Sequence, residues 1–436
     1  MKISQLKVDA LFGLYDYSID FKHDEEDLTV ITSPNGFGKT TLLRIINSLN
    51  PQRLYNLYLL KFKQLCFCFD DGSELVAKET DAKTGQKGGG DTIKDVRRGL
   101  SLVWSRNKKE ICRFDYSPET LNDAKSIAYR RFLSKKHYIL DDVEAKDEFF
   151  VDGEGGEIFN YELARTQKQE QFFLQLATIQ TDFIGANRIY YPIKRDRIRR
   201  NSYETPILQV VSELKQSLSE AVTEFQDNFQ RLDSKFIDML LEDKGHKISE
   251  DDYNKRAALL SEKIDELVQF GLTNKQKLPS YDSDKSQILD AYLLLMEEKL
   301  EYFKDLLPKV RLFSKNVQQK RFADKTIRVS PQHGLRIESD NGDILRADML
   351  STGEQNQLVL LYDLIFKTPK GSILLIDEPE SSLHVAWQND FVDDMQNIAR
   401  QKGLQIVIAT HSPIIVSNTP DNQVFDLFYL QNKNNA

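Results

Sequence analysis

Apolar and polar residues alternate near the start of the chain, and this period of two predicts β-strands. Residues 2–8 and 15–21 show it clearly. Short uninterrupted apolar runs at 28–32, 372–376 and 404–409 are instead typical of strands buried on both faces. Buried strands therefore come from both ends of the chain, and we predict an α/β fold in which the two ends build one head.

The middle of the chain has a longer period. Apolar residues are spaced by threes and fours over 207–239, 253–267 and 289–307, with breaks at Gly245 and Pro279. Narrow stripes of this kind resemble coiled-coil seams and predict a helical bundle or short coiled coil inserted into the head. Such an insertion has one of two roles: it serves internal packing alone, or it also recognises a partner. The predicted parts are 1–203, the first part of the head; 204–318, the helical insertion; and 319–436, the second part of the head.

Further elements complete this prediction. The remaining expected helices and strands are helices over 40–49, 122–150, 163–178 and 351–365, and strands over 62–69, 74–77, 182–191, 326–329 and 334–337.

The segment 30–43 reads VITSPNGFGKTTLL, a strand followed by a glycine loop and a helix start. Glycines let backbone N–H groups turn inward around a polyphosphate, and the helix points its positive end at that charge. Lys39 would reach the β and γ phosphates, and the Thr40 hydroxyl would bind Mg²⁺. Ser33 departs from the usual pattern, which has glycine there. A glycine-rich turn with an incidental lysine is the alternative. The predicted ATP-binding residues here are Asn35, Gly36, Phe37, Gly38, Lys39, Thr40 and Thr41.

The segment 350–355, LSTGEQ, has two interpretations. Ser351 and Glu354 form the S-x-x-E pattern of a capping box, which alone would only start a helix. An exposed helix start with a serine hydroxyl and the Gly353 N–H would also grip a γ-phosphate bound by another subunit. We place Ser351, Gly353 and Glu354 with the predicted nucleotide-binding residues.

Carboxylates follow the apolar run 372–376. One of Asp377 and Glu378 would hold Mg²⁺, and the other would orient and deprotonate the attacking water. His411 follows the run 404–409 and would sense the γ-phosphate. Glu378 and His411 are the predicted catalytic residues, and Thr40 and Asp377 are the predicted metal ligands.

Composition restricts the partners. The net charge of -8 and pI near 5.5 disfavour binding to nucleic acid or anionic membranes except through a local patch. One basic run exists, at 188–200 beside Tyr190 and Tyr191, and either a solvated loop or a nucleic-acid contact explains it. No apolar run approaches about 18 residues, so we expect a cytoplasmic protein without a membrane partner. The basic residues of the run are Arg188, Lys194, Arg195, Arg197, Arg199 and Arg200.

Three smaller features of the sequence remain. Cys66 and Cys68 alternate in one strand and would share a face, but no second pair completes a zinc site, so these thiols and Cys112 are expected to be buried. Phe12 or Tyr15 would stack on an adenine or belong to the core. The glycine-rich segment 83–91 lacks the lysine and helix start of a second phosphate loop.

The order GFGKT, LSTGEQ, LLIDEPE, SSLH, ATHS resembles the ABC-type P-loop ATPase heads of the SMC and OLD families over about half of the chain. By that resemblance Asp377 binds Mg²⁺, Glu378 is the catalytic base and His411 the switch histidine. Ser351 and Gly353 would act on the nucleotide of a second copy of the chain in a homodimer or larger homo-oligomer. The resemblance also implies a signalling loop at Ser381, Ser382 and Leu383 and a glutamine that closes the Mg²⁺ shell, for which Gln180 is a candidate.

In its detailed residue sequence, the segment 350–388 resembles the stand-alone ATPases of bacterial anti-phage operons, above all the AriA type of PARIS systems. That resemblance implies a sensor or scaffold that holds a separate toxic effector of the Toprim nuclease type and releases it when a phage trigger appears. Residues 414–436 contain no D-x-D pair, so we expect any nuclease activity in another polypeptide. The alternative function is a DNA-repair or DNA-loading ATPase of the SMC or RecF type.

Overall fold

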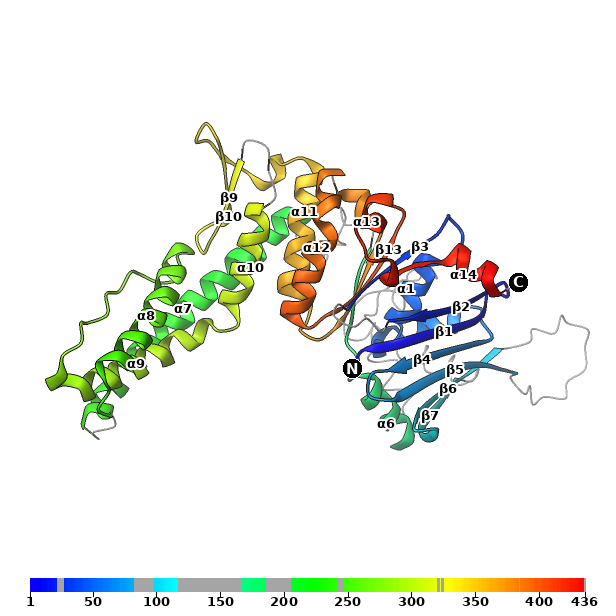
Figure 1. Cartoon of the computed structure of the whole chain (residues 1–436), viewed down its shortest axis with the longest axis horizontal. Coiled ribbons are helices and arrows are strands. Elements are labelled where there is room, and N and C mark those ends of the chain that lie inside the picture. Colours follow the sequence, from blue (N-terminus) through cyan, green and yellow to red (C-terminus); the bar gives the residue numbers. More distant parts are fainter. Residues whose placement is uncertain are drawn as a thin grey trace, which may run out of the picture. The chain divides into compact units, whose positions relative to one another are not determined.

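The computed structural model places two compact units, 1–186 with 368–436 and 187–367 (Figure 1). The helix expected at 122–150, the segment 83–91 and the basic run 188–200 lie outside the residues that the structure describes. The described residues are 1–21, 27–81, 98–116, 167–185, 205–241, 246–319, 322, 325–383 and 385–434.

A five-stranded parallel sheet runs through the first unit in the order β14-β3-β13-β12-β8. Thr32 pairs with Thr410, and Ala409 pairs with Asp377, so three neighbouring strands end at one level. Strands from both ends of the chain share this sheet, which confirms the predicted α/β class. The strands are β3 (Leu28–Thr32), β8 (Thr181–Ile184), β12 (Ile373–Asp377), β13 (Gln405–Thr410) and β14 (Val424–Asp426).

A six-stranded antiparallel sheet forms the other layer of this unit, in the order β2-β1-β4-β5-β6-β7 (Figure 1). The hairpin of β6 and β7 was not predicted. Its turn residues Asn107 and Lys108 both have left-handed backbone angles, φ 52° and 62°, but the turn lacks the glycine that usually signals such a hairpin. The strands are β1 (Ile3–Leu11), β2 (Tyr15–Asp20), β4 (Gln64–Phe69), β5 (Ser73–Asp81), β6 (Arg98–Arg106) and β7 (Lys109–Tyr116).

Helix α1 (Lys39–Asn47) joins the two layers into one hydrophobic core that includes residues of both sheets. Every residue of β12 and β13 is buried, as in a sheet with helices on both faces. Each large apolar side chain buried in this way contributes about 1.5–3 kcal/mol. The other helices of the unit are α2 (Tyr55–Leu59), α6 (Gln167–Leu176), α12 (Val385–Lys402), α13 (Pro413–Ser417) and α14 (Leu427–Asn434).

Three helices form the bundle of the second unit: α7 (Pro206–Leu241), α8 (Glu250–Gln269) and α9 (Ser286–Leu300) (Figure 1). The predicted apolar stripes are on its inside. The prediction ran the last stripe to Leu307, but a 3₁₀ turn at Glu301–Phe303 ends α9, and α10 (Leu306–Gln319) is a separate helix. Buried stripe residues include Leu214, Leu218, Leu260, Ile264, Leu293 and Met296.

The antiparallel strands β9 (Lys325–Ser330), β10 (Gly334–Ser339) and β11 (Ile344–Leu345) also belong to the second unit. Gly334 has φ +68°, and a Cβ there would lie 2.2 Å from the Val211 carbonyl oxygen of α7. Only glycine lets the hairpin approach α7 this closely. Helix α11 (Thr352–Tyr362), which continues as a π-helix over Asp363–Lys367, lies in this unit as well. The predicted second part of the head was 319–436, whereas the compact unit that contains the parallel sheet takes up the chain again only at 368. The compact units and the predicted domains therefore divide the chain at different places.

Candidate functional site

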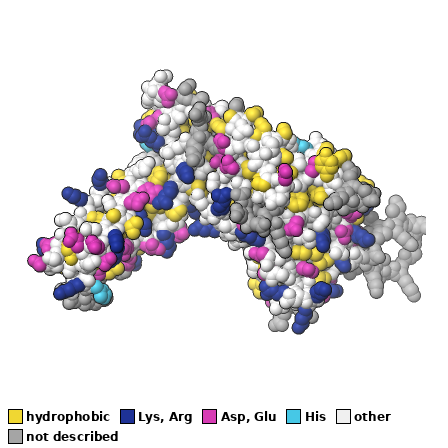
Figure 2. Space-filling model, viewed as in Figure 1, with side chains coloured by type: hydrophobic (Ala, Val, Ile, Leu, Met, Phe, Trp, Pro, Cys, Tyr) yellow, Lys and Arg dark blue, Asp and Glu magenta, His cyan; other side chains and the backbone are white. Residues whose placement is uncertain are grey.

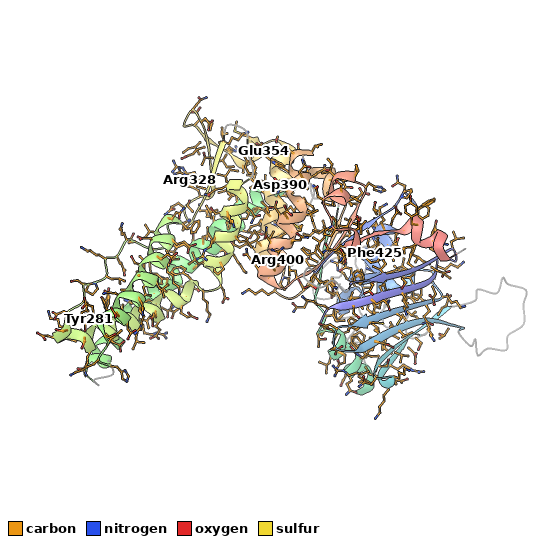
Figure 3. All side chains as sticks on the ribbon, in the orientation of Figure 1. Tyr281, Arg328, Glu354, Asp390, Arg400 and Phe425 are labelled. Atoms are coloured by element: carbon orange, nitrogen blue, oxygen red, sulfur yellow. The ribbon has the colours of Figure 1, made fainter. Side chains whose placement is uncertain are left out.

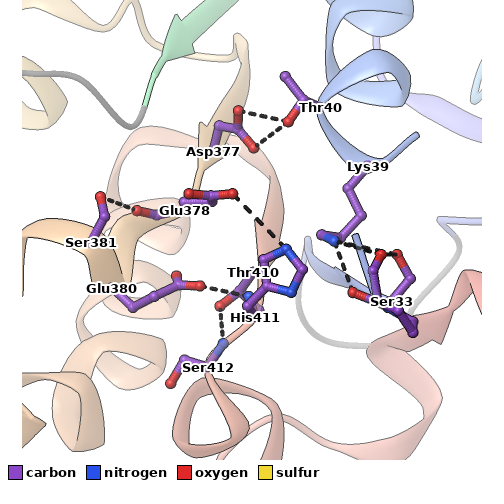
Figure 4. A network of polar contacts seen from close by, with 11 residues as sticks. Ser33, Lys39, Thr40, Asp377, Glu378, Glu380, Ser381, Thr410, His411 and Ser412 are labelled. Atoms are coloured by element: carbon purple, nitrogen blue, oxygen red, sulfur yellow. Dashed lines mark hydrogen bonds and ion pairs between the residues drawn. The ribbon is translucent and has the colours of Figure 1, made fainter. Parts of the chain in front are cut away.

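The site lies at the carboxyl end of the parallel sheet. The glycine loop follows β3, Glu378 follows Asp377 at the end of β12, and His411 follows β13, which lies between those two strands. Ligands of parallel α/β sheets bind beyond the carboxyl ends of the strands. The predicted residues Lys39, Thr40, Asp377, Glu378 and His411 are therefore brought together at one edge (Figure 4).

The glycine loop has the backbone that a phosphate cradle requires. Gly36 and Gly38 have φ +90° and +84°, left-handed angles that glycine adopts without strain. A Cβ at Gly38 would also lie 3.4 Å from Leu11 Cδ2, whereas nothing lies within 4 Å of one at Gly36. Asn35 and Gly36 are exposed, so the loop presents its backbone to solvent.

Lys39 is buried, with 7% of its surface exposed. Its Nζ donates to the Ser33 carbonyl oxygen at 2.8 Å and lies 3.3 Å from the Ser33 hydroxyl and the Pro34 carbonyl oxygen (Figure 4). Ser33, the departure from the glycine pattern, thus supplies an acceptor. Burial lowers the pKa of Lys39, against the attraction of Glu378 and Asp377, so its ammonium is poorly compensated here. A bound polyphosphate would supply the missing negative charge.

Thr40 and Asp377 face each other across the strand ends. The Thr40 hydroxyl donates to both carboxylate oxygens of Asp377, at 3.1 and 3.0 Å. Burial raises the pKa of Asp377, partly opposed by the Thr40 hydrogen bond. Mg²⁺ binds hard oxygen ligands of this kind and usually keeps several waters. The two side chains fit a Mg²⁺ site, and the ion would offset the buried negative charge of Asp377 while neutralising the phosphates.

Glu378 adopts a left-handed backbone, φ 45° and ψ 58°, which a residue with a Cβ rarely adopts. Its N–H donates to the Ala409 carbonyl at 2.8 Å, and its Oε1 lies 4.0 Å from Nε2 of His411. Both side chains are partly exposed, at 41% and 34%. A partly exposed carboxylate can orient and deprotonate a water molecule, which is the role predicted for Glu378, and the adjacent His411 is where a group that senses the γ-phosphate was predicted.

Ser351 and Glu354 form the predicted capping box at the start of α11. The Ser351 N–H donates to Glu354 Oε2 at 2.8 Å, and Lys325 of β9 donates to Glu354 Oε1 at 3.0 Å. Glu354 is labelled in Figure 3. The Ser351 N–H and Lys325 hold the pKa of Glu354 below its usual range, against the effect of burial. Both carboxylate oxygens of Glu354 are thus occupied within the chain. Ser351 is exposed and Gly353 half-buried, so the helix start is open to a ligand.

Gln180 is not at the site. It directly precedes β8, and its carbonyl accepts from the N–H of Ile373, the first residue of β12. The strands are parallel, so Gln180 is at the amino end of the sheet, about 16 Å along the strand from the level of Asp377 at the functional edge. The sequence places Gln180 just before the predicted strand but does not show in which direction that strand runs through the sheet.

Sequence reasoning missed Glu380. Its Oε1 accepts from the His411 N–H at 2.5 Å (Figure 4). The available signal was its place in the D-E-P-E run, three residues after Asp377. Of the predicted signalling loop, Ser381 donates to the Glu378 carbonyl at 2.9 Å and Leu383 is buried. The Ser382 side chain lies outside the described part of the chain.

The two candidates for base stacking differ. Tyr15 packs its ring against Tyr17 and Phe37, at 5.8 and 5.7 Å between centroids. Phe37 itself is edge-on to Phe428 at 5.6 Å. Phe12 is 41% exposed, with φ 56°. Tyr15 is thus partly buried against the core, as the alternative expected, and Phe12 is the more exposed of the two.

The cysteines share no metal site in the described ranges, where no cluster of metal-binding side chains occurs. Cys66 and Cys68 lie on one face of β4, as predicted, but this face is half-buried, and Cys112 alone is fully buried. Burial raises the pKa of Cys66 to about 12 and that of Cys112 to about 11. In the part of the chain that is described, no helix has the length and apolar character to cross a membrane.

Comparison with known proteins gives one family match and several distant likenesses. Residues 1–416 match the family model described as AAA ATPase domain. The spermidine/putrescine import ATP-binding protein PotA of Mycoplasma genitalium is 21% identical over 92% of this chain and 70% of its own length. The SMC head domain from Thermotoga maritima aligns over 98% of this chain and 94% of its own, with a TM-score of 0.31 and 11% identity. The Smc head with an extended coiled coil bound to the C-terminal domain of ScpA, from Pyrococcus furiosus, aligns over 96% and 91%, with a TM-score of 0.35 and 12% identity.

Proposed function

The chain belongs to the AAA ATPase domain family, and from that premise we propose that it hydrolyses ATP as the sensor and scaffold of a bacterial anti-phage defence system. ATP hydrolysis is implied by the family. The observation that carries its assignment to this site is the buried Lys39 beside the Thr40–Asp377 pair at the end of the parallel sheet. ATP with Mg²⁺ fits this arrangement of one cation and two hard oxygen ligands.

We further propose that each site is completed by a second copy of the chain. Ser351 belongs to a different compact unit from Lys39, and its hydroxyl is at an exposed, capped helix start. Helix N-termini bind phosphate oxygens through free N–H groups and the helix dipole. In this proposal, Ser351 and Gly353 of one copy bind the γ-phosphate held by Lys39 of the other.

The bundle of α7, α8 and α9 supports a sensor better than a long DNA-bridging arm. Its longest helix, α7, has 36 residues, a length of about 54 Å. Over the helical unit, Lys and Arg side chains are interspersed with Asp and Glu (Figure 2). A mixed surface suits a protein partner, such as a phage trigger or a nuclease effector, better than a polyanion.

Copurification tests this role. We expect the tagged chain to copurify with the product of a neighbouring gene in its operon, and ATP-binding (Lys39→Ala) and hydrolysis (Glu378→Gln) variants both to lose protection against phage in plaque assays. Exchanging the charges of Glu262 and Lys263, exposed on α8, is expected to disturb trigger recognition or effector holding with ATPase activity nearly normal. Full protection by both site variants would overturn the proposal.

A DNA-repair or DNA-loading ATPase is the second candidate, favoured by the basic run 188–200. It predicts tight duplex binding at physiological salt that falls steeply as salt rises. Charge reversal at the run would weaken that binding and flatten its salt dependence. Tight binding that needs these residues, with no copurified effector, would favour this candidate over the sensor. The residues to reverse are Lys194, Arg195, Arg197, Arg199 and Arg200.

A further inference from the structure

Glu380 connects the ends of two adjacent strands. It lies in the 3₁₀ turn Pro379–Ser382 that follows β12, and its Oε1 accepts from the backbone N–H of His411, which follows β13, at 2.5 Å (Figure 4). A hydrogen bond to an ionised carboxylate is about twice as strong as one between neutral groups. The bond therefore ties the backbone of His411 to the turn that carries Glu378.

The second oxygen of Glu380 is left without a partner. Oε2 is buried and accepts no hydrogen bond from any described residue. A buried carboxylate oxygen without a donor destabilises a fold, and such groups in native proteins call for an explanation other than stability. An alanine would remove this unfavourable burial together with the bond to His411. The side chain is thus a poor choice for stability and a good one for holding His411.

The turn around Glu380 also fixes Glu378. The Ser381 hydroxyl donates to the Glu378 carbonyl at 2.9 Å, and the Glu378 N–H donates to Ala409 at 2.8 Å. These bonds maintain the left-handed backbone of Glu378, and the Glu380 bond adds His411 to the same rigid group. Within this group, His411 Nε2 lies 4.0 Å from Glu378 Oε1.

We propose that Glu380 is a positioning residue, which holds His411 against Glu378 and thereby sets the rate of ATP hydrolysis without contacting the nucleotide. The inference rests on the roles proposed above for Glu378 and His411. Displacing a catalytic group by about 1 Å can slow a reaction by about a hundredfold. Such a change lowers kcat more than it changes KM, because ATP is still bound by the glycine loop.

Glu380→Ala tests the proposal through two separate readouts, kcat and Tm. We expect kcat to fall about tenfold or more with KM for ATP within about twofold of the wild type. We expect Tm to stay close to that of the wild type, because removal of the unpartnered oxygen offsets the loss of the bond to the exposed His411 N–H. The control is Thr368→Val, which removes a buried hydroxyl bonded to Asp182 at 2.6 Å and should lower Tm while leaving kcat unchanged. A lower Tm with normal kcat in Glu380→Ala would make the residue merely structural and overturn the proposal.

A double-mutant cycle shows whether Glu380 acts through His411. In a His411→Ala background, Glu380→Ala should cause little further loss of kcat, because the imidazole that it positions is absent. Equal losses in both backgrounds would overturn the inference while leaving the site assignment intact. A His411→Ala variant with normal kcat would instead refute the role of His411, and the inference with it.

Discussion

The carboxyl edge of the parallel sheet and the helical bundle differ in whether their buried charged side chains have ionic partners. In the bundle, the Asp290 side chain is 8% exposed and accepts from Arg256 at 2.7 Å, and Arg256 also pairs with Glu297 at 2.9 Å. At the sheet edge, Lys39 donates to neutral carbonyl and hydroxyl oxygens, and Asp377 accepts from a neutral hydroxyl. The bundle pairs its charges, whereas the sheet edge leaves a cation and an anion without ionic partners at contact distance.

This difference separates a region built for stability from one built for binding. Hydrogen bonds to Glu297 and Asp290 raise the pKa of Arg256, which favours its charged form. At the sheet edge, burial lowers the pKa of Lys39 and raises that of Asp377, which disfavours both charged forms. Local rules are broken where function needs it. A polyphosphate with Mg²⁺ would supply the opposite charges that Lys39 and Asp377 lack at contact distance.

The largest effect on stability is expected inside the bundle. Leu293 of α9 is fully buried, and Leu293→Ala should lower the free energy of unfolding by about 2–5 kcal/mol in denaturant titrations. ATPase activity per folded molecule should change little. The neighbouring Leu294 is 38% exposed, so Leu294→Ala is the matched control and should cost far less. Equal losses in the two variants would show that α9 does not pack as described.

The largest effect on activity is expected at the sheet edge. Glu378→Gln should slow ATP turnover by about a hundredfold or more, the scale of a positioned general base. Nucleotide binding should persist, because Lys39 and Thr40 are unchanged, and this is measured by titration with a fluorescent ATP analogue. An unchanged turnover rate would place the base elsewhere.

Removing a paired charge from the bundle should destabilise it. Arg256→Ala leaves the buried Asp290 without its ionic partner, although the His246 N–H still donates to it, and should lower the free energy of unfolding by about 1–3 kcal/mol. Lys285→Ala breaks an exposed pair with Asp282 and should change it by less than about 0.5 kcal/mol. Thermal unfolding of both variants would measure the difference. Equal losses of stability in the two variants would contradict the contrast between the two regions.

Removing a charge from the sheet edge should instead stabilise the protein. Burial raises the pKa of Asp377 above its ordinary 3.8, so the folded state holds this proton more tightly than the unfolded state. That contribution to stability is full at low pH and is lost as pH rises through the folded pKa. Asp377→Asn should therefore raise Tm at pH 7 more than at pH 4, without nucleotide. A lower Tm at pH 7 would contradict the assignment of unfavourable charge to this site.

Much of the fold follows from local sequence. The apolar runs that became β3, β12 and β13 and the glycine loop predicted the α/β head and its functional edge, because burial and backbone freedom are properties of single segments. The stripes of α7 to α9 predicted the bundle for the same reason.

The missed features depend on contacts between distant segments. The sequence does not show that Gly334 must approach Val211. Gln180 was misplaced because strand order and direction decide which end of β8 faces the nucleotide. Glu380 was missed because its partner, the His411 N–H, is on another strand.

We propose above that each ATP site is shared by two copies of the chain, and mixing two variants tests this most directly. Lys39→Ala and Ser351→Arg subunits, each expected to be inactive alone, can be mixed, with two different tags to prove mixed assembly. In a mixed dimer, the Ser351→Arg chain supplies an intact Lys39 and the Lys39→Ala chain an intact Ser351, so one site is complete. For random equal mixing, up to about a quarter of the wild-type ATPase rate should return, since half of the dimers are mixed and each has one of two sites intact. Zero recovery in proven mixed assemblies would contradict the shared site.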